Sequence, residues 1–175
     1  MYRIMLCAAA LLVGAAIQPA TAFDPLLDYL WCARENGDAS IDACTRILAA
    51  GPSPSALRFR GVAYLSKGDY DHAIADTNDA VRLTPGQIFP GDYYIRGQAY
   101  VGKNDFDRAI DNFDQAIMLS PRNFKAYSGR GRAYEGKNDP EHAIADYDRA
   151  LKLNPRLDDA RQARERVQAL LAKGK

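Results

Sequence analysis

The stretch Gly131-Arg132-Ala133-Tyr134 occurs three times in this 175-residue chain, with small changes. It appears earlier as Gly97-Gln98-Ala99-Tyr100 and as Gly61-Val62-Ala63-Tyr64, so the glycines are 36 and then 34 residues apart. Self-similarity at a fixed period of this length is the signature of a repeat protein. We therefore expect a stack of similar units rather than one globular core.

The residues after each copy follow a constant order, which predicts two helices per unit. A Lys-x-Asp triplet comes first, an Ala-Ile pair next, then a second alanine and a closing proline. In the third unit these residues are Lys137, Asp139, Ala143-Ile144, Ala150 and Pro155. The aspartates of the triplet are expected to cap the second helix, because a carboxylate accepts hydrogen bonds from free first-turn amides. They are Asp69, Asp105 and Asp139.

These residues at this period resemble the tetratricopeptide-repeat family, over residues 54–157. The resemblance implies an all-α fold, a right-handed α-solenoid of helix hairpins with a concave groove that usually binds peptides or partner proteins. Three repeats are expected, at about 54–87, 90–123 and 124–157. The first repeat has Leu57 and Thr77 where the others have aromatic residues, so we expect its core to be looser.

The segments on either side of the three repeats extend the stack. Residues 24–50 align loosely with a repeat and are predicted to form a degenerate N-terminal helix hairpin. Residues 158–172 are predicted to form a final, charged helix. Because the terminal unit of a solenoid must present a polar outer face, this helix is expected to cap the stack.

The N-terminal residues 1–22 are typical of a signal peptide. Arg3 precedes an uncharged apolar run from Ile4 to Ile17, and Ala20-Thr21-Ala22 fits a cleavage site. The run is too short to span a bilayer comfortably, although an uncleaved anchor is the alternative. We therefore expect an exported protein, periplasmic or secreted, with no membrane anchor after cleavage.

Cleavage would leave two cysteines, Cys32 and Cys44. An even pair in an exported chain indicates a disulfide, which would staple the short N-terminal hairpin. The alternative is two buried thiols that act as small hydrophobic groups. A metal site is not expected, because two cysteines without a nearby histidine do not complete a tetrahedral set of ligands.

The charge balance excludes several functions. Removing residues 1–22 removes one basic residue and no acid, which leaves 22 basic and 22 acidic residues. This balance lacks the basic excess of a nucleic-acid-binding protein. His72 and His142 occupy equivalent repeat positions, and Gly129-Arg130-Gly131 lacks the context of a phosphate loop. No catalytic, cofactor-binding or metal-binding residues are predicted, and no cofactor is expected.

The family resemblance places the binding groove on the first helix of each hairpin. The expected groove residues are Arg58, Val62, Leu65, Tyr94, Gln98, Val101, Lys125, Ser128, Arg132 and Glu135. A subset of the family clamps the C-terminal carboxylates of cytosolic chaperones with Lys, Asn, Asn, Lys and a further basic residue. The matching positions here hold Arg58, Val62, Ile95, Lys125 and Gly129, which disfavours that ligand.

These observations predict a non-catalytic adaptor or scaffold of the bacterial cell envelope that binds a peptide or partner protein in the groove. The alternative is a structural brace that associates with itself. For that alternative, a dimer patch is expected at Val62, Leu65, Tyr94 and Ile95. The identity of the partner does not follow from the sequence.

Overall fold

The computed structural model describes residues 24–34, 37–87 and 89–173, so the predicted signal peptide lies outside the described residues. Every regular element in these ranges is a helix. The helices are α1 (Pro25–Cys32), α2 (Gly37–Ala50), α3 (Pro54–Ser66), α4 (Tyr70–Leu83), α5 (Pro90–Gly102), α6 (Phe106–Leu119), α7 (Phe124–Gly136), α8 (Pro140–Leu153) and α9 (Asp158–Lys173).

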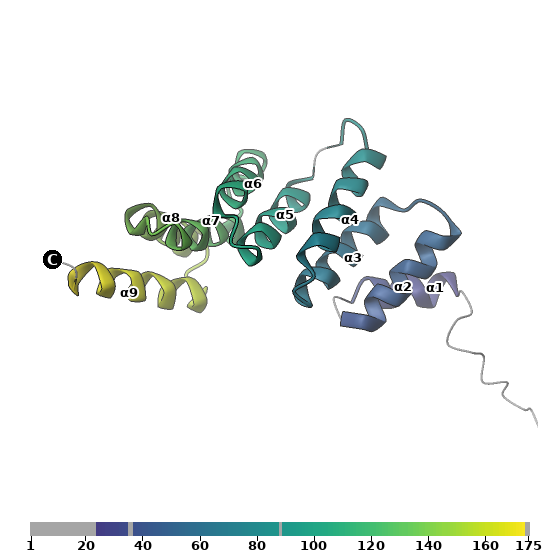
Figure 1. Cartoon of the computed structure of the whole chain (residues 1–175), viewed down its shortest axis with the longest axis horizontal. Helices are drawn as coiled ribbons and strands as arrows, with labels where there is room; N and C mark the ends of the chain where they lie inside the picture. The colour runs from purple at the N-terminus through teal and green to yellow at the C-terminus, as the bar shows by residue number, and fades with distance from the viewer. Residues whose placement is uncertain (1–23, 35–36, 88, 174–175) are drawn as a thin grey trace, which may run out of the picture.

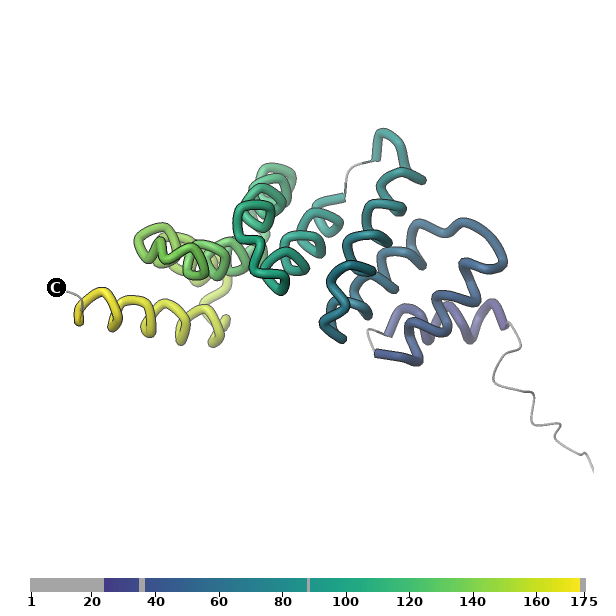
Figure 2. The backbone as a smooth tube through the Cα atoms, viewed as in Figure 1, coloured from purple at the N-terminus to yellow at the C-terminus, as the bar shows by residue number. Residues whose placement is uncertain are grey.

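The helices form successive hairpins along one long axis (Figures 1 and 2). The pair α1–α2 lies at one end, the pairs α3–α4, α5–α6 and α7–α8 follow, and α9 lies at the other end. Each helix packs mainly on its neighbours in the sequence, and α5 also contacts α3 and α7. The predicted all-α solenoid of helix hairpins is confirmed.

The turn within each repeat follows from the Lys-x-Asp triplet. The middle residue has a positive φ in all three repeats: 77° at Gly68, 58° at Asn104 and 59° at Asn138. Glycine and asparagine are the residues that tolerate this left-handed conformation best. The aspartate that follows accepts a hydrogen bond from the backbone amide three residues later, so the predicted N-caps are confirmed at α4, α6 and α8.

The repeated glycine makes room for a side chain of the second helix. At Gly97 a Cβ would lie 2.8 Å from the ring of Phe113, and at Gly131 it would lie 2.9 Å from the ring of Tyr147. Both rings are fully buried. At Gly61 the neighbour is the smaller Thr77, with its hydroxyl at 3.2 Å. The first repeat therefore has no aromatic ring at this place, and its looser core stays a prediction.

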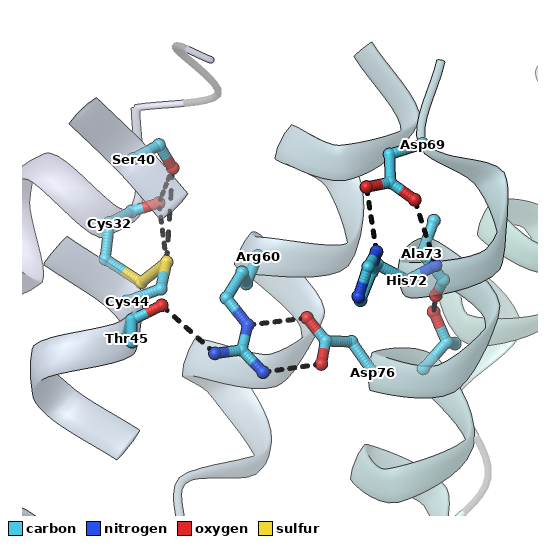
Figure 3. Close-up of polar contacts among 10 residues, drawn as sticks. Cys32, Ser40, Cys44, Thr45, Arg60, Asp69, His72, Ala73 and Asp76 are labelled. Carbon is cyan, nitrogen blue, oxygen red and sulfur yellow. Dashed lines mark hydrogen bonds and ion pairs between the residues drawn. A yellow bond between two sulfur atoms is a disulfide. The ribbon is translucent and has the colours of Figure 1, made fainter. Parts of the chain in front are cut away.

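A row of arginines joins each repeat to the one before it. Figure 3 shows Arg60 of α3 between α4 and α2: it donates to both carboxylate oxygens of Asp76 at 2.7 Å and to the hydroxyl of Thr45 at 3.1 Å. Arg96 bonds Asn112 and Asn78 in the same way, and Arg130 bonds Asp146 and Asp114. Charged hydrogen bonds of this kind fix the register between neighbouring hairpins.

The first hairpin is held by different forces. Cys32 at the end of α1 and Cys44 in α2 are joined by a disulfide. The Ser40 hydroxyl donates to the carbonyl oxygen of Cys32 at 2.9 Å (Figure 3). The buried carboxylate of Asp28 accepts a bond from the Arg46 guanidinium, which holds the pKa of Asp28 below its usual value. A covalent bond and an ion pair therefore anchor α1.

Candidate binding site on α5, α7 and α9

A hollow of about 830 Å³ lies between the first helices of the last two repeats and α9. Its lining consists of apolar side chains, small residues, two polar side chains and four charged side chains. The lining residues are Val101, Gly102, Asn104, Phe106, Arg132, Glu135, Gly136, Asp159, Gln162, Ala163 and Arg166. The volume falls in the range of ligand-binding clefts in proteins.

Two glycines of the lining let first helices pack closely on aromatic rings. A Cβ at Gly136 would overlap the ring of Phe106, so only glycine lets α7 approach that ring. Gly102 has the same relation to Tyr70 one repeat earlier. The phenylalanine ring is half-buried and leaves one apolar surface for the hollow.

Glu135 is already occupied by partners within the chain. Its carboxylate accepts bonds from the Arg166 guanidinium at 2.9, 3.0 and 3.1 Å and from the Tyr147 hydroxyl at 3.0 Å. Burial and the nearby carboxylate of Glu135 raise the pKa of Tyr147 far above its usual range, so the hydroxyl keeps its proton and donates it. Glu135 therefore fixes α7 against α9 rather than offering a free charge.

Among the four charged side chains of the hollow, Glu135 and Arg166 pair with each other. Asp159 and Arg132 do not, and Arg132 is the one cation there that the described part of the chain leaves unpaired. Its side chain is exposed, and none of the described residues forms a hydrogen bond or an ion pair with it. A guanidinium presents several N–H donors in a planar fork that matches a carboxylate. Arg132 is therefore the group best able to bind an acidic ligand here.

The structure brings together three of the residues expected in the groove and separates the others. Val101, Arg132 and Glu135 line the hollow. Val62, Leu65 and Ser128 are half-buried on other parts of the stack, and Lys125 is exposed. Tyr94 and Gln98 bond each other, with 2.9 Å between the amide nitrogen and the phenol oxygen.

Arg58 is engaged in a structural ion pair. Its guanidinium donates to both oxygens of the buried Asp92 carboxylate, at 2.7 and 3.1 Å, and to the Thr84 hydroxyl at 3.3 Å. It also lies 4.1 Å from the centre of the Phe89 ring. These contacts join α3 to α5 across the longer connection between the first two repeats, so Arg58 is committed to that junction.

One of the four residues expected in a dimer patch on α3 and α5 is buried, so that part of the prediction is wrong. Ile95 is only 7% exposed, because its side chain points into the stack. Gly129 is also buried, since a Cβ there would lie 2.5 Å from the ring of Phe113. Neither position offers a side chain to a ligand or to a second copy.

Sequence reasoning missed the contribution of α9, which was expected only to cap the stack. Asp159, Gln162 and Arg166 of this helix form one wall of the hollow. A signal was present: Arg164 follows Arg130 by the repeat period of 34 residues. Its guanidinium bonds Asp148 of α8 at 2.8 Å, as Arg130 bonds the preceding hairpin. The helix α9 is therefore placed like the first helix of a further repeat.

Other kinds of site find no support in the described ranges. No group of three or more histidine, cysteine, aspartate or glutamate side chains is arranged to hold a metal ion there. No helix in those ranges combines the length and the apolar character needed to cross a membrane. His72 and His142 are exposed, and the Nδ1 atom of each forms a hydrogen bond with the N-cap aspartate of its own helix. The ring of His72 stacks on Tyr64, and that of His142 stacks on Tyr134.

Two family models match the chain, and both describe the tetratricopeptide repeat. One covers residues 33–88 and the other residues 97–168. Together they span most of the chain, and the gap between them is the connection to α5 and its first residues. The chain belongs to the tetratricopeptide-repeat family. No curated protein matches it significantly.

Solved structures of the same fold give the same result. The TPR domain of Arabidopsis OM64 is 25% identical, covers 66% of this chain and 94% of its own, and has a TM-score of 0.61. MamA is 27% identical, with 78% of each chain covered and a TM-score of 0.67. The first TPR of Spaghetti (RPAP3), bound to the HSP90 peptide SRMEEVD, is 29% identical, covers 68% and 93%, and has a TM-score of 0.62. Proteins of this family generally mediate protein–protein interaction, and nothing in the described part of the chain points to catalysis.

Proposed function

We propose that this protein is an interaction module of the cell envelope that holds an extended, acidic segment of a partner protein in the hollow of α5, α7 and α9. The observation that carries the proposal is Arg132, an exposed guanidinium without a partner among the described side chains, beside the apolar Val101 and Phe106. A carboxylate of the segment would bind Arg132, and an adjacent apolar side chain would cover the phenylalanine ring.

The shape of the hollow favours a segment of chain over a small molecule. Its walls come from three successive first helices, so a ligand that fills it runs along the stack. Direct hydrogen bonds to a charged group are stronger than neutral ones and give specificity for the acidic residue. The pairing of Glu135 with Arg166 keeps the second arginine from competing for the same carboxylate.

The proposed contact does not use the residues that match a chaperone-tail clamp. At the five positions that match a chaperone-tail clamp, Arg58 is bound to Asp92, and Ile95 and Gly129 are buried. Val62 has no polar group, which leaves only Lys125 free to bind a carboxylate. The proposed contact with Arg132 is therefore made deeper along the stack and by another residue.

Site-specific cross-linking tests this function. A photoreactive phenylalanine in place of Gln162, which is exposed and lines the hollow, is expected to capture the partner in envelope extract. Mass spectrometry then identifies the attached segment, which should contain an aspartate or glutamate. Arg132→Glu should reduce capture at least about tenfold, the equivalent of about 1.4 kcal/mol.

The matched control reverses a charge outside the hollow. Arg122 is exposed in the connection between α6 and α7 and does not line the site. Arg122→Glu should leave the cross-linked product unchanged. Equal capture by the Arg132→Glu variant, or a product whose attached segment has no acid, would show that the hollow does not work in this way.

The envelope location rests on the leader-like residues 1–22 and on the disulfide. A bond between Cys32 and Cys44 persists in an oxidising compartment and is reduced in most cytosols. Expression of the full chain in a bacterial host, followed by fractionation and intact-mass measurement, should give a periplasmic protein cleaved after Ala22. A cytosolic protein of full mass would exclude the proposed location and leave the binding test unaffected.

A further inference from the structure

In the first helix, α1, a charged side chain and a cysteine are buried, whereas the large apolar side chains are exposed. Its buried side chains are Asp28 and Cys32, which form the ion pair with Arg46 and the disulfide with Cys44. The exposed fractions of Leu26, Leu27 and Leu30 are 74%, 51% and 58%, and Tyr29 and Trp31 are exposed beside them. An ion pair, the disulfide and an edge-on contact of Tyr29 with Phe59 of α3 anchor this helix, and its three leucines face solvent.

The apolar face of α1 is unusual in the described part of the chain. Half of the large hydrophobic side chains that are exposed there lie on this one short helix. Together they present an apolar patch on the order of 500 Å², near the largest found on typical monomers, and such patches usually mark interaction sites. The helix also lies at the end of the stack, away from the hollow of α5, α7 and α9 (Figure 1).

We propose that α1 is a self-association surface, through which two copies of this chain pair with their α1 helices antiparallel. The proposal goes beyond the proposed function, because it uses a different surface and does not need a bound partner segment. Leucines in the i and i+4 positions, such as Leu26 and Leu30, lie on one side of a helix and can pack against the same side of a second copy.

The opposite charges at the two ends of α1 favour a second copy of this chain as the partner of its apolar face. The α1 helix has Asp24 at its N-cap, and Arg34 follows its C-terminal end. In an antiparallel pair the amino end of one helix lies beside the carboxyl end of the other, so Asp24 of each copy meets Arg34 of the second copy. The opposed helix dipoles add to this attraction. Two patches of this size bury about 1,000 Å² in total, which suits a weak, reversible dimer.

A lipid surface fits the same patch less well. Helices that lie on membranes carry lysine or arginine on their polar face, which bind anionic headgroups. No basic residue lies within α1, and the exposed side chains before it and in α2 include Asp24 and Asp42. These acids would repel an anionic membrane and leave Arg34 as the main attractive charge.

The single tryptophan of the chain, Trp31, reports directly on this surface. The protein purified from the periplasm of a host that expresses the full chain is examined by analytical ultracentrifugation and by acrylamide quenching of fluorescence. Over about 1 to 100 µM, the range expected for a weak dimer, the mass should double while quenching of Trp31 decreases. Leu30→Glu and Leu26→Glu should each give a monomer at the highest concentration, with unchanged helical circular dichroism because both side chains are exposed.

Two controls make the outcome decisive. Met118→Glu, at an apolar side chain 66% exposed on α6, should dimerise like the unchanged protein. Arg34→Glu should weaken association at low salt more than at high salt, because the lost attraction is electrostatic. The proposal fails if the protein stays monomeric, if Leu30→Glu still dimerises, or if dimerisation leaves Trp31 equally quenched. A blue shift of Trp31 emission with phosphatidylglycerol vesicles in a protein that remains monomeric would assign the face to lipid instead.

Discussion

Alanine in place of Gly129 tests the packing that joins the second and third repeats. The ring of Phe113 lies between two glycines: a Cβ at Gly129 would be 2.5 Å from it, and a Cβ at Gly97 would be 2.8 Å from it on the other helix. Ordinary carbon contacts are about 3.5–4.0 Å, so the new methyl group would overlap the ring by about 1 Å. The ring is fully buried, and it would have to shift to accommodate the methyl group.

The expected loss of stability follows from two opposing effects. Overpacking of this kind costs about 3 kcal/mol, and alanine gains about 1 kcal/mol over glycine inside a helix. Gly129→Ala should therefore lower the free energy of unfolding by about 2 kcal/mol, measured by urea denaturation and circular dichroism. Gly91→Ala is the matched control, because nothing lies within 4 Å of its Cβ position in α5. It should be neutral or raise stability by about 0.5 kcal/mol.

A second substitution checks that the ring is the cause. Phe113→Leu shortens the buried side chain, so Gly129→Ala should cost less in that background than in the unchanged protein. Equal denaturation midpoints for Gly129→Ala and Gly91→Ala would refute the reasoning, as would strictly additive effects in the double variant.

Three further predictions concern the hairpins individually. Reduction of the Cys32–Cys44 bond should lower the stability of the first hairpin by about 3 kcal/mol, as expected for a 12-residue separation. Unchanged hydrogen exchange in α1 and α2 after reduction would contradict this prediction. The hydrogen bond with the His142 side chain holds the pKa of Asp139 below its ordinary 3.8. The contact therefore stabilises the folded state fully above pH 3.8, and this stabilisation is lost as the pH falls through the lowered pKa. Nuclear magnetic resonance titration of the His142→Ala variant should show the pKa of Asp139 rising toward 3.8 while that of Asp69, in the first repeat, stays low. Amides of α3 and α4 should exchange faster than those of α7 and α8, because the first repeat lacks the buried ring, and equal protection would show that threonine packs as well.

Most of the hairpin architecture follows from short-range signals in the sequence. The Lys-x-Asp triplet combines a left-handed turn residue with an N-cap, and both are local properties of a few residues. The repeated Gly-x-Ala-Tyr stretch likewise identifies the first helix of each unit. The pairing of Cys32 with Cys44, expected from the redox compartment, is present in the structure.

The partners of long polar side chains were harder to predict, because they depend on contacts between repeats. Arg58 was expected in the groove but bonds Asp92, which lies 34 residues away in the next repeat. Arg132 of α7, which was also expected in the groove, has no such partner among the described residues. The two arginines stand at different places in the repeat, because Arg58 aligns with Ser128 of the third repeat and Arg132 aligns with Val62 of the first. Both were expected in the groove, and only the packing of neighbouring hairpins separates the structural group from the one available to a ligand.

The α9 helix also limits how copies of the protein can assemble. Glu165 stands where Gly131 would recur after 34 residues, so a further helix could not approach α9 as α8 approaches α7. Contact between this charged end and the leucines of α1 would bury charges without partners, at a cost of several kcal/mol for each ion. A head-to-tail contact between α9 and α1, which would build an open filament rather than a closed dimer, is thereby disfavoured.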